Sequence, residues 1–284
     1  MVMKKLTPIL VAISILVFYL VVGAFITDNH KWMLFATLSF TFIIGYIVYN
    51  TGGFAANRKK FLLFVLPICI LFLGTMIFQN SSFVRGFPYI LFIPLVSFAA
   101  IFAKQKKAWW TFFVAIPVFA FIGLVAFPNW FSFYVNFNSH VEKDFPAWGL
   151  VDKNGQKVIL EKDKIVVLDL WNKHCGACIR KMPAFEEEYL KYKNHPEIAF
   201  YSVYVRWGED TFAEAVQITD KFGYAFKTIY SEEHDSIVGK RLGFEGYPQL
   251  FILKNGKLRY DGQLVTDPVV YVHSLENEIE RLLD

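Results

Sequence analysis

The sequence is poor in cysteine: it has only three among 284 residues, and two of these lie close together as Cys175 and Cys178. Three cysteines are too few for a scaffold held together by disulfides, so this pair indicates redox chemistry or a metal site. The sequence also lacks a basic patch interleaved with exposed aromatic residues, the usual mark of a nucleic-acid surface. We therefore expect no nucleic acid among the partners of this protein.

Charged residues are rare between residues 6 and 127, where apolar and aromatic residues form five long runs. A helix needs about 20 apolar residues to cross the hydrocarbon core of a lipid bilayer. No Asp, Glu, Lys, Arg or His lies near the middle of a run, which argues against a transporter with an intramembrane ion pathway. We predict an all-α bundle of about five transmembrane helices. The runs are Leu6–Ile26, Met33–Tyr49, Phe61–Phe78, Phe87–Ala103 and Ala108–Phe127.

The basic residues between the runs predict the direction of insertion, because cytoplasmic loops are enriched in Lys and Arg. One set of breaks holds eight basic residues and the alternate set holds two, Lys31 and Arg85. This bias predicts a cytoplasmic N-terminus and a C-terminal half on the extracytoplasmic, periplasmic side of an inner cell membrane. A cleaved signal peptide in place of the first run leaves the C-terminal half on the same side. The eight are Lys4, Lys5, Arg58, Lys59, Lys60, Lys104, Lys106 and Lys107.

The composition becomes that of a soluble protein near residue 136. We divide the chain into a transmembrane region, 1–127, a juxtamembrane linker, 128–145, and a soluble domain, 146–284. In this domain short β-branched runs alternate with helical patterns, which predicts an α/β fold with a mixed central sheet. The predicted elements are a hairpin at 148–160, strands at 164–171, 198–205, 249–253 and 257–260, and helices at 179–193, 210–222, 235–242 and 267–283.

Cys175 and Cys178 follow the predicted strand that ends in Trp171, at the start of the next helix. The N-terminus of a helix carries partial positive charge, which stabilises a thiolate, the nucleophile of disulfide exchange. Cys175 is therefore the expected attacking sulfur, and Cys178, one helical turn later, can resolve the mixed disulfide.

Three other uses of the pair fit less well. A zinc site needs two more ligands at suitable spacing, and none is paired nearby. A c-type haem site needs His after the second cysteine, where this chain has Ile179. A structural disulfide across two residues closes a very short loop and adds little stability. We predict a redox-active disulfide, with no metal and no cofactor.

These motifs resemble the thioredoxin superfamily, in particular its TlpA-like extracytoplasmic branch. The resemblance covers residues 146 to 283, about half of the chain, and implies a thioredoxin-like fold with thiol–disulfide oxidoreductase activity. The membrane half shows no comparable resemblance. The matching segments are Val166–Trp171, Cys175–Cys178, Met182–Pro183 and Gly246–Pro248.

The resemblance also implies roles for single residues. Asp169 matches the buried carboxylate that accepts or relays the proton of the resolving thiol. Pro248 matches the cis-proline that faces the cysteine pair, and the backbone of Tyr247 is expected to bind an extended substrate segment by strand addition. Trp171 is expected to belong to the substrate-contacting surface. His174 stands where many relatives have Trp, and its two interpretations, a group that favours the thiolate and an exposed spectator, have equal weight.

Rival functions on the same fold are disfavoured. A peroxidase usually has Thr or Ser three residues before the reactive cysteine, where this chain has Asn172. An intramembrane electron relay needs a cysteine pair in the spans, which contain only Cys69. A non-enzymatic receptor or assembly subunit would not need the complete set of cysteines, acid and proline.

We therefore predict a membrane-anchored oxidoreductase that exchanges disulfides with cysteines of exported client proteins. A separate redox partner is expected to supply or remove its electrons. Analogy with the family favours reduction, and an oxidase or isomerase of exported proteins is the alternative. The client, the redox partner, the oligomeric state, the role of Cys69 and any role of the membrane half beyond anchoring stay open.

Overall fold

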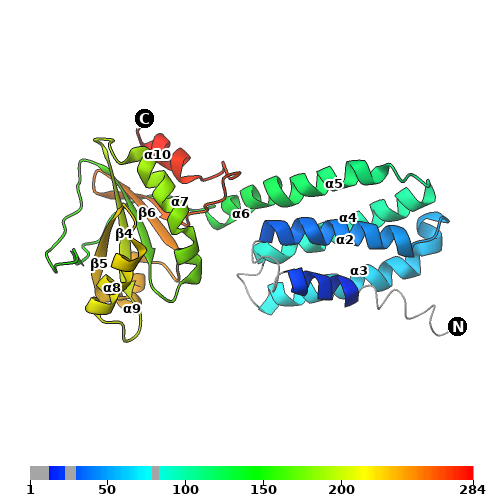
Figure 1. Ribbon diagram of the computed structural model, residues 1–284, viewed down its shortest axis with the longest axis horizontal. Coiled ribbons are helices and arrows are strands. Elements are labelled where there is room, and N and C mark those ends of the chain that lie inside the picture. Colours follow the sequence, from blue (N-terminus) through cyan, green and yellow to red (C-terminus); the bar gives the residue numbers. More distant parts are fainter. Residues whose placement is uncertain (1–12, 23–29, 79–82, 284) are drawn as a thin grey trace. The chain divides into compact units, whose positions relative to one another are not determined.

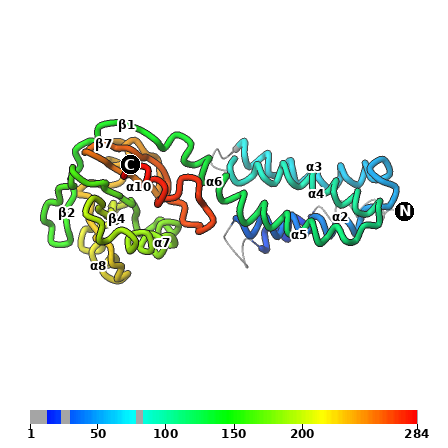
Figure 2. The backbone as a smooth tube through the Cα atoms, turned by 90° about the horizontal axis from the view of Figure 1, so that it is seen from above, coloured from blue at the N-terminus to red at the C-terminus, as the bar shows by residue number. Residues whose placement is uncertain are grey.

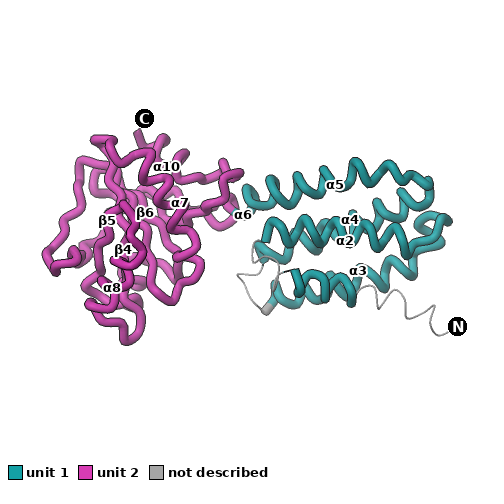
Figure 3. Tube along the Cα trace, in the orientation of Figure 1, with its two compact units in different colours: residues 1–131 teal, residues 132–284 magenta. Residues whose placement is uncertain are grey.

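The computed structural model describes residues 13–22, 30–78 and 83–283 (Figure 1). The chain forms two compact units, unit 1 at 1–131 and unit 2 at 132–284 (Figure 3). About half of the first predicted span, Leu6–Ile26, lies outside the described residues, and its described part, 13–22, is helical.

Unit 1 is built of long helices (Figure 1). Four helices in the described part of the chain are long and apolar enough to cross a membrane: 30–48, 53–77, 83–105 and 111–135. They contain most of the second to fifth predicted runs, so membrane-length helices are confirmed there. The helix at 111–135 continues beyond Phe127 because the aromatic residues that follow Phe127 extend the apolar pattern. The elements are α2 (His30–Val48), α3 (Gly53–Phe78), α4 (Phe83–Gln105), α5 (Thr111–Phe121), the π-helical η3 (Ile122–Ala126) and α6 (Phe127–Val135).

Small and neutral polar residues shape the interior of unit 1. At Gly45 on α2, an added Cβ would lie 2.9 Å from the Cβ of Ala100 on α4, so the two helices approach closely there. The amide of buried Asn57 donates to the carbonyl oxygens of Asn50 and Gly53 at 2.8 and 2.7 Å. Its oxygen accepts from the Asn50 N–H at 2.8 Å, so the turn into α3 keeps its backbone groups paired within the protein.

Unit 2 contains a mixed seven-stranded sheet in the order β1-β7-β6-β3-β4-β5-β2. The central strands β3, β4 and β5 are parallel, whereas β6, β7, β1 and β2 join by antiparallel pairing. Every residue of β3 is buried, which suits its apolar β-branched sequence. The strands are β1 (His140–Asp144), β2 (Leu150–Val151), β3 (Ile165–Trp171), β4 (Ile198–Arg206), β5 (Lys227–His234), β6 (Gln249–Lys254) and β7 (Lys257–Gly262).

Helices cover both faces of this sheet. Alternate residues of a strand point to opposite faces, so Val166, Leu168 and Leu170 of β3 pack on the side covered by α9. On the other side, α7 and α10 lie side by side (Figures 1 and 2), and the ion pair Lys191–Glu276 joins them at 2.7 Å. The α/β thioredoxin-like architecture with a mixed sheet is therefore confirmed. The helices are α7 (Gly176–Tyr192), α8 (Phe212–Phe222), α9 (Asp235–Leu242) and α10 (Leu275–Leu283).

Several local details differ from the sequence-based expectation. The stretch 128–145, expected to be a linker, holds most of α6 and all of β1. Strand β5 was not expected, because Ser231, Glu232 and Glu233 interrupt its apolar pattern. The last helix does not start at Asp267. The backbone turns at 267–274, and α10 begins at Leu275 behind Ser274, whose hydroxyl accepts from the Asn277 N–H at 3.2 Å.

Candidate active site

The cysteine pair lies where β3 gives way to α7. Cys175 is the N-cap of α7, and its sulfur accepts a hydrogen bond from the Cys178 N–H at 3.1 Å. A disulfide joins the two residues, whose Cα atoms are 5.2 Å apart. Cys175 is half-buried and Cys178 is completely buried. Only the first sulfur is therefore accessible to a partner, and the free N–H groups of the helix start favour its thiolate form.

Trp171 supports the pair from inside the domain. Its ring is 1% exposed, and its Nε1–H donates to the Ser202 hydroxyl at 2.7 Å. The ring packs edge-on against Tyr204 at 4.9 Å and belongs to the same apolar cluster as Cys178. The sequence suggested a substrate contact for Trp171, and the structure places its ring beneath the cysteines.

Asp169 is a buried carboxyl on the face of β3 that α7 covers. It is 1% exposed, and its Oδ1 accepts from the Lys181 ammonium, which is itself only 5% exposed. Burial raises the pKa of Asp169, and the neighbouring positive charge of Lys181 opposes that shift. A raised pKa suits proton transfer near neutrality.

Lys181 was not identified from the sequence, although a signal was present. Cys178, Lys181, Met182 and Phe185 follow helical spacing, and all four are buried on the inner face of α7. A lysine within an apolar stripe needs a buried partner, because an unpaired buried charge is costly. The position of Lys181 in this stripe could therefore have indicated its pairing with Asp169.

Pro248 stands at the start of β6, and the peptide bond between Tyr247 and Pro248 is cis, the isomer that the resemblance implies. The register of β3 and β6 pairs Leu170 with Gln249, so Pro248 lies beside the end of β3 that leads to the cysteines. The Tyr247 ring packs edge-on against Phe244 at 5.3 Å. Burial raises the pKa of Tyr247.

The Asp210 carboxylate contacts two residues of the loop before Cys175. The Asp210 carboxylate pairs with the Lys173 ammonium at 2.7 Å and lies 3.5 Å from Nε2 of exposed His174. It also accepts from the Tyr204 hydroxyl at 3.0 Å. Burial alone would raise the pKa of Asp210, but the hydrogen bonds from Lys173 and Tyr204 hold it below its usual value. Asp210 and Lys173 lay outside the sequence-based predictions because no motif links residues so far apart in the chain.

One group in the described residues could hold a metal ion, and it lies on other elements. The ligand atoms of His140, His273 and Glu278 lie within 4.8 Å of one another. Both imidazoles hydrogen-bond the Glu278 carboxylate, and the Arg281 guanidinium donates to it at 3.0 Å. These contacts already satisfy the carboxylate. The cluster therefore fits a structural tie between β1 and α10 better than a metal centre.

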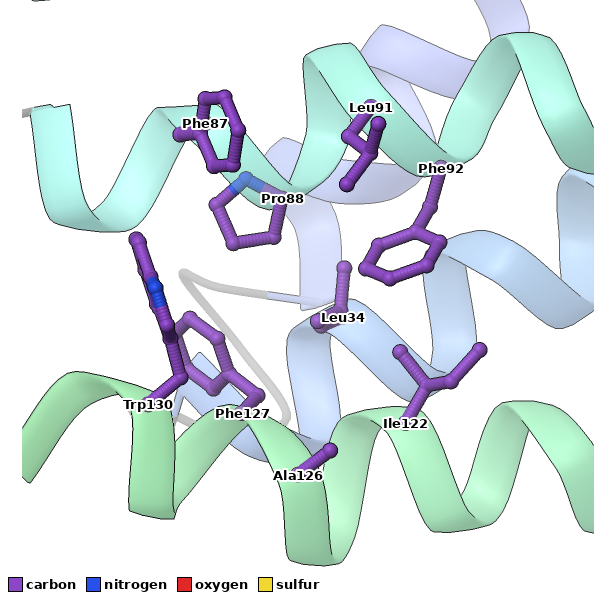
Figure 4. A pocket seen from close by; sticks show the side chains of 9 residues that line it. All are labelled: Leu34, Phe87, Pro88, Leu91, Phe92, Ile122, Ala126, Phe127 and Trp130. Atoms are coloured by element: carbon purple, nitrogen blue, oxygen red, sulfur yellow. The ribbon is translucent and has the colours of Figure 1, made fainter. Parts of the chain in front are cut away.

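Unit 1 has an apolar cavity of about 270 Å³ (Figure 4). Figure 4 shows Phe127 and Trp130 on one wall and Phe87 and Pro88 of α4 on the other. No side chain that lines the cavity is ionisable. The cavity therefore offers no ionisable side chain for proton transfer.

No model of a protein family matches this chain, and no curated protein matches it. Solved structures similar to it include the thioredoxin domain of a thiol–disulfide oxidoreductase from Bacteroides vulgatus, with 19% identity and a TM-score of 0.38, over 52% of this chain and 98% of that one. A thiol:disulfide interchange protein from Bacteroides sp. shows 18% identity and a TM-score of 0.41, over 50% of this chain and 88% of that one. An uncharacterized thioredoxin-like protein from Porphyromonas gingivalis shows 19% identity and a TM-score of 0.39, over 49% of this chain and 90% of that one.

Proposed function

We propose that this protein is a membrane-anchored thiol–disulfide oxidoreductase whose unit 2 reduces disulfides of exported client proteins outside the cytoplasm. The observation that carries this proposal is the asymmetry of the cysteine pair. Cys175 is accessible and caps a helix, whereas Cys178 is completely buried one turn later. An accessible acidic thiol and a protected resolving thiol are what two-step disulfide exchange requires.

In the first step the Cys175 thiolate attacks one sulfur of the client disulfide. A mixed disulfide forms between Cys175 and the client, and the other client sulfur leaves as a thiolate. In the second step Cys178 loses its proton to Asp169 and its sulfur attacks the sulfur of Cys175. The Cys175–Cys178 disulfide forms, the second client sulfur leaves, and the client has gained two electrons.

We assign client binding to the segment around the cis peptide bond between Tyr247 and Pro248. The segment at Tyr247 precedes β6 without joining the described ladder, so its backbone can pair with an extended client segment by strand addition. His174, exposed beside Cys175, is the side chain best placed to meet the client near the reacting sulfurs. A separate dithiol protein then returns the pair to its reduced form.

The proposed location of unit 2 outside the cytoplasm depends only on the last membrane-length helix, 111–135. The Lys-rich break at 104–107 lies immediately before the apolar helix 111–135, and unit 2 follows that helix. If the Lys-rich break is cytoplasmic, as the excess of basic residues favours, unit 2 lies on the opposite side. This inference does not depend on whether the first run is cleaved.

The reduction potential of the full chain tests the direction of electron flow. We expect a value near or below about −270 mV, as for reductants of this class, whereas about −120 mV would mark an oxidase. The full chain should also catalyse reduction of insulin by dithiothreitol. Failure of the reduced chain to accelerate that reaction would overturn the proposed activity.

Labelling of intact cells tests the location. A membrane-impermeant maleimide should modify reduced Cys175 without permeabilisation. As the matched control, Trp109→Cys in a chain with Cys175→Ser and Cys178→Ser should be labelled only after permeabilisation. The reverse pattern would place unit 2 in the cytoplasm.

A further inference from the structure

We propose that Lys181 is a positioning residue of the resolving step: it holds Asp169 as a carboxylate and leaves one carboxylate oxygen free to take the proton of Cys178. This inference rests on the proposed function and adds a residue to its second step. The observation behind it is the buried ion pair between β3 and α7.

The geometry assigns different tasks to the two oxygens of Asp169. Oδ1 accepts from the Lys181 ammonium, whereas Oδ2 is buried and has no hydrogen-bond partner in the structure. Buried polar atoms are nearly always hydrogen-bonded, so an unpartnered carboxylate oxygen is an exception that needs an explanation. An oxygen that must accept a proton during the reaction provides one.

Cys178 lies on the same helix face as Lys181. The two residues are three apart on α7, and both are buried on the face turned toward β3. Asp169 occupies this face of β3, as its contact with Lys181 shows. The neighbours of Asp169 in the sheet register are Ser202 on β4 and Leu250 on β6, which carry no charge. The groups that can titrate or bear charge beside Asp169 on α7 are thus Lys181 and Cys178.

The need for Lys181 follows from the cost of burial. A completely buried carboxyl without a cation is strongly biased toward its protonated form, which cannot accept a proton. The Lys181 ammonium favours the ionised form and so opposes the effect of burial on the pKa of Asp169. With Lys181 in place, Asp169 can act as a base toward Cys178 at neutral pH.

Packing alone does not account for this pair. Attraction between buried charges is offset by the loss of their hydration, so an apolar pair of similar volume is often equally stable. The inner face of α7 is otherwise apolar around Lys181, with Met182 and Phe185 buried beside it. A cation at this position makes more sense as part of the chemistry at the neighbouring thiol.

The test uses the reduced full chain in detergent with Cys69→Ala in every variant, and Ellman's reagent as the disulfide. Stopped-flow absorbance separates two releases of thionitrobenzoate. In the first, the Cys175 thiolate attacks the reagent and forms a mixed disulfide. In the second, Cys178 displaces the bound thionitrobenzoate and closes the Cys175–Cys178 disulfide. Both rates are measured from pH 5 to pH 9.

Lys181→Met keeps the length of the side chain and removes its charge. We expect the second release to slow about tenfold at pH 7 and its pH profile to move up by about one unit or more. The first release should stay within about twofold of the parent, because Cys175 attacks before Asp169 is needed. Lys181→Arg, which keeps the cation, should restore the parent profile.

A double-mutant comparison separates this role from a structural one. In an Asp169→Asn background the second release should already be slow, and Lys181→Met should change it by less than about twofold. The double variant leaves no unpaired buried charge, so its second release can still be measured if Lys181→Met folds poorly. An unchanged pH profile in Lys181→Met, or an equal further loss in the Asp169→Asn background, would overturn the inference. Absence of a second release in the parent would instead overturn the proposed function.

Discussion

The two units bury polar groups in different ways. In the described part of unit 1 the buried polar side chains are neutral, and no Asp, Glu, Lys or Arg is buried there. Unit 2 buries four charged residues, Asp169, Lys181, Asp210 and Glu278, and each makes an ion pair. Two of these pairs flank the cysteines, and the Glu278 carboxylate also bonds His140, which ties β1 to α10.

This difference fits the proposed surroundings of each unit. A helix in a bilayer must satisfy its polar groups internally, and a charge there is expensive, so neutral residues such as Asn57 and Thr41 bond to nearby carbonyl oxygens. A water-exposed domain can hold paired charges in its core when packing fixes their geometry. The comparison fits the proposal that unit 1 anchors the chain and that unit 2 performs the chemistry.

The largest expected effect separates the cysteines of the two units. Cys175→Ser removes the attacking thiol, so insulin reduction by the full chain should fall to the uncatalysed background. Cys69→Ala changes a lone thiol within α3 and should leave the rate within about twofold. A large loss in Cys69→Ala would mean that unit 1 carries electrons, and the comparison between the units would fail.

The next prediction contrasts two exposed apolar residues. Leu66 near the middle of α3 is 53% exposed and Ile159 in unit 2 is 86% exposed. Leu66→Lys would place a charge in the bilayer at a cost of about 2.5–3.5 kcal/mol, whereas Ile159→Lys faces water and should cost nearly nothing. Folded yield and resistance to unfolding by sodium dodecyl sulfate measure both variants. Equal tolerance of the two substitutions would argue against a membrane location for α3.

The pH dependence of stability should come from unit 2, with Glu278 as a contributor. Burial alone would raise the pKa of Glu278, but the hydrogen bonds from His140, His273 and Arg281 hold it below its usual value of 4.5. The unfolded chain then binds more protons in the window just below 4.5, so stability rises with pH through that window. The contribution is complete above 4.5 and is lost as the pH falls through the folded pKa.

Thermal unfolding of Glu278→Gln between pH 3 and pH 7 tests this sign. The variant should melt below the parent at pH 7, by about 2–4 °C for each kcal/mol lost, and the difference should shrink as the pH falls below 4.5. A constant difference would show that the carboxylate charge of Glu278 does not contribute.

The smallest effect concerns a helix start. Thr211 caps α8, accepting from the Glu214 N–H at 3.2 Å, and Glu214 accepts from the Thr211 N–H at 2.9 Å. Thr211→Ala should cost about 1 kcal/mol in urea unfolding of unit 2, and Thr211→Ser should cost much less. Equal costs for the two variants would assign the effect to the lost methyl group.

Much of the architecture was predictable because it depends on patterns within short segments. Apolar runs of membrane length identified the helices of unit 1, and the fully buried, largely apolar β3 identified the centre of the sheet. Strand β5 was missed because Glu232 and Glu233 break its pattern, and its pairing with β4 depends on residues distant in the chain. The start of α10 was misplaced because the turn at 267–274 contains His273 with a positive φ of 52°, which local propensity does not predict.

The sequence by itself determined the apolar helices of membrane length, the α/β pattern and a cysteine pair at the beginning of a helix. These features follow from hydrophobic periodicity and from the residues next to Cys175. Only the tertiary structure decided which buried polar groups meet: Lys181 with Asp169, Lys173 and Tyr204 with Asp210, and two histidines with Glu278. The physical reason is that these contacts join separate strands and helices, and burial between those elements makes each partner necessary to the other.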